Sequence, residues 1–273
     1  MIRVGIDCGT TLIKFVWRDD RQGGYNFATS GSDRELKAVI KKLQGLGVTQ
    51  ANSLGIGSHP CLDAFELIRM RGNPIALELY VQALGAKRLL TLYNKKFSAS
   101  EFVLVSIGTG TSYVVLGANG FQNYPFGRPL GGGFIIGLGM ALGIGATFTE
   151  IEKRAVGKPL DILIHDLVSE VDPSDPNFIV TNFGKAKKSS TREDLAATLF
   201  HCVASNVVQD VAMIQHFVGV PRHIVYIGTT VALSPTLQKY LKYYSIKLGF
   251  APVFIGKYGG YAGAVGVLHM NDI

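Results

Sequence analysis

Two short turns rich in glycine and hydroxyl side chains constrain this chain most. The first covers residues 7–12 and reads DCGTTL, and the second covers residues 106–112 and reads SIGTGTS. Apolar runs rich in β-branched residues precede and follow both turns: 2–6, 13–17, 102–105 and 113–116. Because only small residues can follow such a turn tightly, the pattern predicts a strand, a tight turn and a strand, used twice.

Turns of this kind suit a nucleotide. Their backbone N–H groups and threonine hydroxyls can bind polyphosphate oxygens. One such turn is usually only a hairpin. Two turns at strand ends, each opening one half of the chain, favour a catalytic function. We therefore predict two β-hairpins that hold one nucleotide from opposite sides. The candidate phosphate ligands in the turns are Gly9, Thr10, Thr11, Gly108, Thr109 and Gly110.

Asp7 closes the first apolar run beside the first turn. A carboxylate at this place can hold a hydrated Mg²⁺ ion that bridges phosphates. The alternative interpretation is an Asx-turn, in which the aspartate caps the hairpin through its own backbone.

The composition is that of a globular enzyme of a reducing compartment. The chain has 273 residues, enough for two modest domains or one large one, and its 47% hydrophobic content with 17% charged residues predicts a large core. Cys8, Cys61 and Cys202 are isolated, so neither a disulfide framework nor a zinc site is indicated, and we expect a cytoplasmic protein. The net charge of +7 comes from scattered basic residues without a nucleic-acid motif, so we expect anionic substrates and no nucleic acid.

We expect no membrane partner. Met1 leads directly into a predicted strand, which does not resemble a signal peptide. The most hydrophobic stretch, 131–146, is interrupted by glycine and is shorter than the ~20 residues that a membrane span needs. It is therefore predicted to be a buried helix.

The order of predicted elements repeats. The N-terminal third reads as strand, strand, strand, helix, strand, at 2–7, 13–18, 24–28, 33–46 and 52–57. Later strands are predicted at 102–107, 112–117, 120–126, 223–228 and 250–255, with helices at 192–218 and 235–247 and a small-residue helix from Gly259. Ser32 and Thr191 are predicted N-caps. The polar segment 173–190 is expected to be a mobile loop over a site. Two similar halves indicate an internal duplication.

Several motifs together resemble the type II pantothenate kinases of the actin/hexokinase-type ATPase superfamily. They are DxGxTLxK, GTGTS, a helix led by GGG, NFG at 182–184, VYIG and a terminal GGYAGAVG, and they extend through nearly the whole chain. The resemblance implies an α/β fold of duplicated ribonuclease-H-like domains, with mixed five-stranded sheets flanked by helices. The nucleotide cleft lies between an N-terminal half, 1–98, and a C-terminal half, 99–273, with helical dimerisation elements.

The resemblance also implies an activity. It is ATP-dependent phosphorylation of the primary hydroxyl of pantothenate to 4'-phosphopantothenate, the first step of coenzyme A biosynthesis, with Mg²⁺. Glu78 matches the family's catalytic base, and a carboxylate among Leu, Ile and Tyr is a better base than a solvated one. The alternative is an exposed glutamate near a helix start, favoured by the macrodipole. The turns, with Leu12 and Lys14, would hold the phosphates. A homodimer built by the GGG helix and 148–156 is implied, and coenzyme A or an acyl-CoA is a competing ligand.

Two glycine segments are further candidates for the nucleotide side. Gly131, Gly132 and Gly133 let the backbone approach a ligand and leave helix N–H groups free for it, or else serve helix packing together with Gly137, Gly139 and Gly143. The turn Gly228-Thr229-Thr230 and the helix start Gly259-Gly260 also fit an adenosine pocket, because small residues let a ligand lie against the backbone. Tight α/β connections explain these residues equally; the candidate ligands among them are Gly228, Thr229 and Gly259.

The acceptor side departs from the family pattern. The family's arginine ahead of the GGG segment falls on Asn123 and Tyr124 here, and Arg128 lies closer to the glycines. Either Arg128 supplies the charge or the contact is absent. The segment 60–74 also fits the family poorly. The predicted substrate-binding residues are Thr111, Ser112 and Arg128.

Two other functions stay open at this point. One is another small-molecule kinase of the same superfamily, although a sugar kinase would usually have an aspartate as its base. The other is a non-catalytic pseudokinase that binds ATP or an acyl-CoA, for which the displaced arginine is the one indication. The presence of Asp7, Lys14 and Glu78 argues against it.

Overall fold

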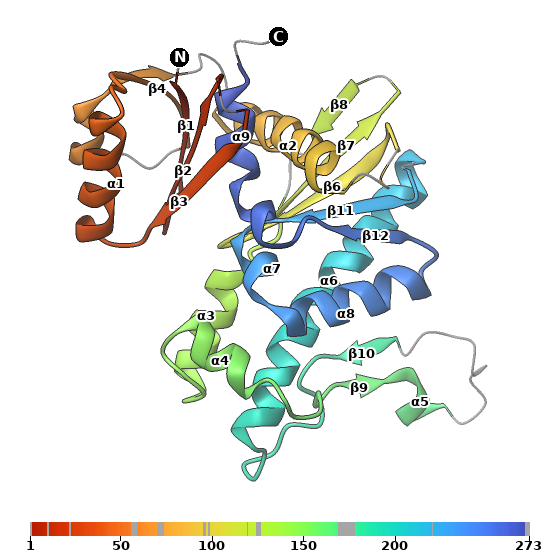
Figure 1. Ribbon diagram of the computed structural model, residues 1–273. Helices are drawn as coiled ribbons and strands as arrows, with labels where there is room; N and C mark the ends of the chain where they lie inside the picture. The colour runs from red at the N-terminus through yellow and green to blue at the C-terminus, as the bar shows by residue number, and fades with distance from the viewer. Residues whose placement is uncertain are drawn as a thin grey trace.

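The computed structural model describes residues 2–9, 11–21, 23–55, 59–69, 74–94, 97, 99–118, 120–123, 127–168, 178–219 and 221–270. Two five-stranded sheets form its framework (Figure 1). The N-terminal sheet has the order β3-β2-β1-β4-β5. Its strands are β1 (Ile2–Cys8), β2 (Ile13–Asp19), β3 (Tyr25–Ser30), β4 (Gln50–Leu54) and β5 (Glu66–Arg69).

The C-terminal sheet repeats this topology. Its order is β12-β11-β6-β7-β8, and its strands are β6 (Phe102–Ile107), β7 (Thr111–Gly117), β8 (Gly120–Asn123), β11 (His223–Ile227) and β12 (Ala251–Phe254). In both sheets the central strand pairs with an antiparallel hairpin partner on one side and a parallel strand on the other. The predicted fold, a duplicated α/β domain with mixed five-stranded sheets, is confirmed.

Helices cover both faces of both sheets. On the outer faces, α1 (Asp33–Gly45) packs on the N-terminal sheet, and α6 (Arg192–Val218) and α8 (Pro235–Lys247) pack on the C-terminal sheet. Between the sheets lie α2 (Pro74–Tyr93) and α9 (Ala262–Leu268) (Figure 1). Each of these two helices packs on the sheet that is farther away in the sequence: α2 packs on β7 and β8 of the C-terminal sheet, whereas α9 packs on β1 and β4 of the N-terminal sheet. The boundary between residues 98 and 99 stays a prediction.

Two glycines bring α2 and α9 into backbone contact. A Cβ atom added to Gly85 would lie 1.8 Å from the carbonyl oxygen of Ala262, and one added to Gly266 would lie 1.9 Å from that of Val81. No side chain fits at such distances. The crossing therefore depends on glycine, and it fixes how the two sheets face each other.

The long helix α6 is a core helix. Thr191 Oγ1 accepts a hydrogen bond from the N–H of Asp194 at 3.1 Å, which confirms the predicted cap, and Gly219 ends the helix in the left-handed conformation with φ of 69°. Among the described residues, this is the one helix long and apolar enough to cross a membrane, and 72% of its apolar window is buried inside the fold. Ser32 caps α1 as predicted.

Some element boundaries differ from the predictions. The strand expected at 52–57 is β4, which ends at Leu54 before Gly55 turns the chain with φ of 104°. The terminal helix begins at Ala262, because 256–261 form the 3₁₀ helix η2. The segment 60–74 contributes η1 (Pro60–Ala64) and the edge strand β5, which was not predicted. The remaining elements are α3 (Gly132–Ala141), α4 (Phe148–Arg154), β9 (Ile162–Leu163), α5 (Ile164–Leu167), β10 (Ile179–Thr181) and α7 (Thr229–Leu233).

The prediction of one buried helix over 131–146 is wrong. The helix α3 ends at Ala141, and a turn leads to α4. Ile135 is buried, but the side chains of Met140 and Leu142 are 57% and 38% exposed. Of the glycines proposed for helix packing, Gly139 lies against Ile151 of α4, where an added Cβ would be 2.3 Å from Ile151 Cδ1.

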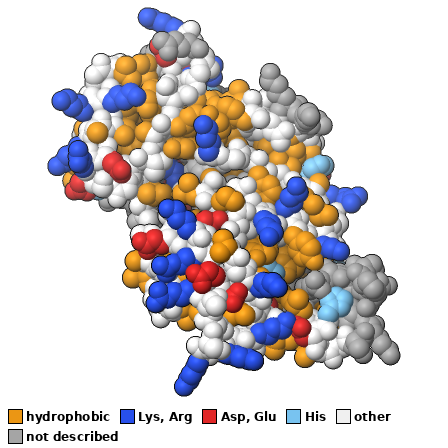
Figure 2. Space-filling view, turned by 60° about the horizontal axis from the view of Figure 1, so that its bottom comes forward, with side chains coloured by type: hydrophobic (Ala, Val, Ile, Leu, Met, Phe, Trp, Pro, Cys, Tyr) orange, Lys and Arg blue, Asp and Glu red, His pale blue; other side chains and the backbone are white. Residues whose placement is uncertain are grey.

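The surface is mixed in charge. Figure 2 shows Lys and Arg side chains scattered over one face among acidic and hydrophobic ones, without one continuous basic field. This pattern agrees with the scattered basic residues of the sequence.

Candidate active site

The two predicted turns face each other. The first is closed by a hydrogen bond from Gly9 N–H to the carbonyl of Leu12 at 3.2 Å, and the second by one from Gly108 N–H to the carbonyl of Gly110 at 2.9 Å. Across the gap, Thr11 Oγ1 lies 3.4 Å from Thr109 Oγ1. Hydroxyls from both halves of the chain therefore converge on one point.

A pocket of about 570 Å³ opens around this point. It is lined by most of the predicted site residues: Asp7, Gly9, Thr11, Leu12, Lys14, Glu78, Gly108, Thr109, Gly110, Thr111, Ser112, Arg128, Gly132, Gly133, Gly228, Thr229 and Gly259. Gly131 packs against the second turn, where an added Cβ would lie 2.7 Å from the carbonyl oxygen of Thr109. Thr10 is outside the described residues, so its position stays a prediction.

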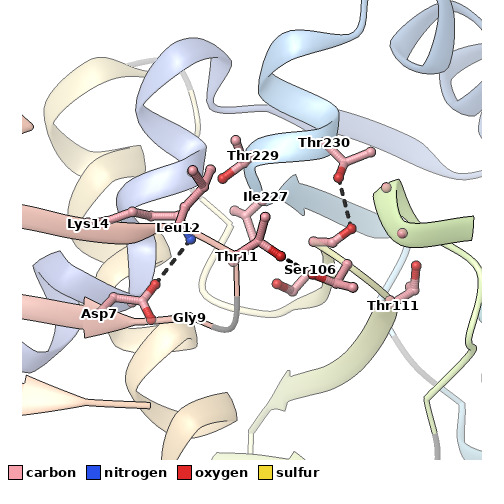
Figure 3. A pocket seen from close by; sticks show the side chains of 18 of the residues that line it. Asp7, Gly9, Thr11, Leu12, Lys14, Ser106, Thr111, Ile227, Thr229 and Thr230 are labelled. Atoms are coloured by element: carbon pink, nitrogen blue, oxygen red, sulfur yellow. Dashed lines mark hydrogen bonds and ion pairs between the residues drawn. The ribbon is translucent and has the colours of Figure 1, made fainter. Parts of the chain in front are cut away.

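Asp7 and Lys14 pair across the first hairpin, where β1 and β2 place them opposite each other (Figure 3). Lys14 Nζ lies 3.3 Å from Asp7 Oδ2, and both side chains are largely buried. Gly263 of α9 lies against the same carboxylate, because an added Cβ would be 2.7 Å from Asp7 Oδ2. The carboxylate is therefore held in place beside the first turn, where it lines the pocket.

Glu78 lies on the first turns of α2 and lines the pocket. Burial raises the pKa of its carboxyl group, the negative charge of Asp7 raises it further, and Lys14 lowers it in part. Gln82, one helical turn later, donates from Nε2 to Glu78 Oε1 at 3.1 Å. A carboxylate with a raised pKa in a pocket can accept a proton from a hydroxyl more readily than a solvated one.

Two N–H groups of the GGG segment bond to the second turn and are not left for a ligand. Gly132 N–H donates to the carbonyl of Gly108 at 2.7 Å, and Gly133 N–H donates to that of Thr109 at 2.9 Å. The prediction that these amides are free is wrong, because the carbonyls of the second turn take them. Thr230 Oγ1 donates to the same Gly108 carbonyl at 2.8 Å (Figure 3).

One side of the pocket combines glycines with apolar side chains. Gly228 has φ of 104°, and a Cβ there would be 2.2 Å from the carbonyl oxygen of Ile107, so no other residue fits this turn. Beside it, apolar side chains of three helices line the pocket: Ile136, Phe148 and Leu233. These three were missed, since helical spacing alone does not distinguish a pocket wall from a core face. Thr230 and Gly260, which belong to the two small-residue segments singled out in the sequence, line the pocket as well.

Arg128, which also lines the pocket, is bonded to Asp210 of α6. Its Nε lies 3.0 and 2.7 Å from Asp210 Oδ1 and Oδ2, and its Nη2 lies 2.6 Å from Oδ1. Tyr113 donates its hydroxyl to Asp210 Oδ2 at 2.6 Å. Thr111, another predicted substrate residue, directs its hydroxyl to the carbonyl of Leu130 at 2.6 Å.

The described part of the polar segment 173–190 does not line this pocket. Residues 178–190 lie away from its lining; β10 pairs with β9, and Phe183 N–H donates to Asp161 Oδ1 at 2.8 Å. The expectation of a loop over the site is wrong for these residues, because a buried aspartate anchors them beside α6. Residues 173–177 are outside the described residues.

Two duplicated five-stranded sheets with a pocket between their hairpins define the class of proteins with the actin/hexokinase-type fold. Solved structures share this fold. The activator of 2-hydroxyisocaproyl-CoA dehydratase from Clostridium difficile, with bound ADPNP, matches with a TM-score of 0.62 at 17% identity, over 100% of this chain and 95% of that one. A ROK family glucokinase from Streptomyces griseus, in complex with glucose and AMPPNP, matches with a TM-score of 0.57 at 13% identity, over 99% of each.

Within that class, the chain belongs to the Fumble family, whose model matches residues 78–270. It is similar over nearly its whole length to type II pantothenate kinases. That of Oceanobacillus iheyensis is 26% identical, over 98% of this chain and 99% of its own. That of Bacillus cereus (strain ATCC 10987 / NRS 248) is 29% identical, over 97% and 96%.

Proposed function

We propose that this protein is a pantothenate kinase, which transfers the γ-phosphate of ATP to the primary hydroxyl of pantothenate. The observation that carries this proposal is the approach of Thr11 and Thr109, at 3.4 Å, in a pocket that Glu78 also lines. Phosphoryl transfer needs mainly positioning and charge stabilisation, and this arrangement supplies donors on two sides and a base beside them.

Different groups of the protein bind the phosphates, bind the adenosine and accept the proton. The two turns bind the β- and γ-phosphates through backbone N–H groups and through the hydroxyls of Thr11 and Thr109. The adenosine lies in the side of the pocket between Gly228 and Gly259, against the apolar wall of Ile136, Phe148 and Leu233. Glu78 accepts the proton of the acceptor hydroxyl, and Gln82 holds one oxygen of that carboxylate.

The donor set also fits Mg²⁺. Groups of three or more metal-binding side chains are absent from the described residues, and Mg²⁺ commonly uses one or two carboxylates, phosphate oxygens and waters instead. Asp7, held between Lys14 and Gly263, would be the protein's contribution, through water. The ion, when bound, neutralises developing charge on the phosphates.

The acceptor side is assigned to Thr111, Ser112 and Arg128. All three line the pocket beside the second turn, where β7 begins. Of these, Arg128 has the charge that suits a carboxylate. Coenzyme A or an acyl-CoA shares the pantothenate moiety, so it is expected to compete here. A reducing, cytoplasmic setting agrees with three free cysteines.

A homodimer is part of the proposal. The side chains of Met140, Leu142 and Val156 are 57%, 38% and 80% exposed; Met140 lies on α3, and Leu142 and Val156 lie in the turns that follow α3 and α4. An interface at this place would cover them. Light scattering on a size-exclusion column is expected to give twice the chain mass for the wild type and a smaller mass for Met140→Glu. A monomeric wild type contradicts this part.

The test of the activity is ADP release from MgATP with and without pantothenate. Turnover is expected to depend on pantothenate and to fall at least about 100-fold in Glu78→Gln, the range of general-base contributions. Equal ADP release without pantothenate, or a fully active Glu78→Gln enzyme, contradicts the assignment. Titration with labelled ATP shows whether an inactive variant still binds nucleotide.

A further inference from the structure

The guanidinium of Arg128 has two edges that can each bind an oxyanion, and Asp210 takes one of them. The side edge, Nε and Nη2, is bonded to both oxygens of Asp210 at 2.6 to 3.0 Å. Within the described part of the chain, no acceptor bonds to Nη1. The end edge, formed by Nη1 and the second hydrogen of Nη2, is therefore open, and it matches a carboxylate in shape and charge.

Asp210 is itself fixed. Tyr113 on β7 donates to its Oδ2 at 2.6 Å, and the Asp210 side chain is only 16% exposed. Burial and the adjacent Asp210 raise the pKa of the Tyr113 hydroxyl far above its usual range, so this hydroxyl remains a donor. Three elements thus hold one side chain: α6 through Asp210, β7 through Tyr113, and the loop before α3 that carries Arg128.

The backbone of Arg128 is fixed as well. Its N–H and C=O pair with the C=O and N–H of Thr111, both at 2.9 Å, so the residue is joined to the first residue of β7. Arg128 lines the pocket, whereas Asp210 does not. A long side chain, 48% exposed, would otherwise sample many rotamers and lose entropy on binding a ligand.

We propose that Asp210 and Tyr113 are positioning residues that direct the free edge of Arg128 to the carboxylate of the acceptor. This inference rests on the proposed function, since it assigns how the same site recognises pantothenate. It also explains how Arg128, which lies closer to the GGG segment than the family's arginine, can bind the acceptor.

Asp210 could act by cancelling the charge of Arg128 or by orienting its side chain. These two roles predict opposite changes in KM for pantothenate in Asp210→Asn. If Asp210 only cancels the charge of Arg128, then Asp210→Asn leaves a stronger cation, and KM for pantothenate falls. If Asp210 orients Arg128, the freed side chain must be ordered again by the substrate. KM for pantothenate then rises about fivefold, the cost of immobilising one long side chain.

The experiment compares pantothenate with panthenol, in which a hydroxymethyl group replaces the carboxylate. In Asp210→Asn, KM for pantothenate is expected to rise about fivefold, while KM for ATP and kcat stay within about twofold of the wild type. KM for panthenol is expected to be the same in both enzymes. Glu193→Gln makes the same charge change on an exposed side chain of α6, roughly 25 Å away along the helix, and is expected to change nothing.

Two further variants keep the assignment open to contradiction if Asp210→Asn folds poorly. Tyr113→Phe removes one hydrogen bond and is expected to raise KM for pantothenate about twofold, again without an effect on panthenol. In an Arg128→Lys background, which keeps the charge but loses the planar edge, Asp210→Asn is expected to add no further rise.

The outcomes distinguish a failure of the positioning role from a failure of the proposed function. Normal wild-type turnover with an unchanged or lower KM in Asp210→Asn overturns the positioning role alone. An equal rise for pantothenate and panthenol overturns it too, because it indicates a general disturbance. Absence of pantothenate turnover in the wild type overturns the proposed function, and this assignment with it.

Discussion

Thr11 and Thr109 are 98 positions apart in the chain, yet their hydroxyl oxygens lie 3.4 Å from each other. Each is in the turn that follows the central strand of its own sheet. The relationship results from the duplication: equivalent turns of two similar sheets face each other across a pocket. A polyphosphate beside this pair would be bound by hydroxyls of both halves, so the contact links the duplicated fold to the proposed function.

Removal of the second hydroxyl tests this pairing. Thr109→Val keeps the shape of the side chain but loses a hydrogen bond to an anionic phosphate, worth about 1.5–3 kcal/mol. KM for ATP is therefore expected to rise at least about tenfold. Thr91→Val, on an exposed face of α2, is the control, because the Thr91 hydroxyl donates to the carbonyl of Lys87 in its own helix. An unchanged KM for ATP in Thr109→Val contradicts the phosphate role.

The raised pKa of Glu78 predicts a pH-dependent cost in stability. Its carboxyl group holds a proton more tightly in the folded state, chiefly through burial, so ionisation at neutral pH opposes folding. The free energy of unfolding then falls as pH rises through the range above the unfolded pKa of about 4.3. Glu78→Gln is expected to raise Tm near pH 7, and the gain is expected to vanish near pH 4.

The measurement is thermal unfolding of both proteins between pH 4 and pH 8. A constant difference in Tm over this range would show that the ionisation of Glu78 is not the cause. Activity moves in the opposite direction: the wild-type kcat is expected to increase with pH as Glu78 loses its proton.

The crossing of α2 and α9 predicts a large packing effect. In Gly85→Ala the new methyl group would lie 1.8 Å from the carbonyl oxygen of Ala262, so the helices must separate. The free energy of unfolding in urea is expected to fall by about 2–3 kcal/mol. Gly45→Ala, exposed at the last residue of α1 with nothing within 4 Å of the added methyl group, is expected to be neutral or slightly stabilising. Similar stabilities for both variants would contradict the account of the crossing.

Gly263 predicts an effect on magnesium. An alanine there would place its Cβ 2.7 Å from Asp7 Oδ2 and displace the carboxylate. The Mg²⁺ concentration that gives half-maximal turnover is expected to rise several-fold in Gly263→Ala, and KM for pantothenate is expected to change less. Gly24→Ala, with open space around the added methyl group, is the control. Equal magnesium dependence in both variants argues against a role of Asp7 at the metal.

Local features of the fold could be predicted from the sequence. The hairpins β1–β2 and β6–β7 follow from apolar runs on both sides of small-residue turns, and the caps Ser32 and Thr191 follow from side-chain chemistry within one helical turn. The strand β5 was missed because it lies at the edge of the sheet and has a mixed sequence, ELIR, which carries little periodicity.

Long-range relationships could not be predicted in this way. The amides of Gly132 and Gly133 are free in any local view of a helix start, and only the fold brings the carbonyls of the second turn to them. The pair of Arg128 and Asp210 joins a loop to a helix 82 positions later, and neither residue has a distinctive neighbour pattern. The apolar pocket wall is likewise assembled from three separate helices.

The most direct test of the central claim is identification of the product. Purified protein is incubated with MgATP and pantothenate, and the products are analysed by mass spectrometry and ³¹P NMR. The expected product is phosphopantothenate with its phosphorus coupled to the two protons of the primary CH₂ group, formed at least about 100-fold more slowly by Glu78→Gln. Unmodified pantothenate after complete consumption of ATP, or phosphate on another oxygen, would contradict it.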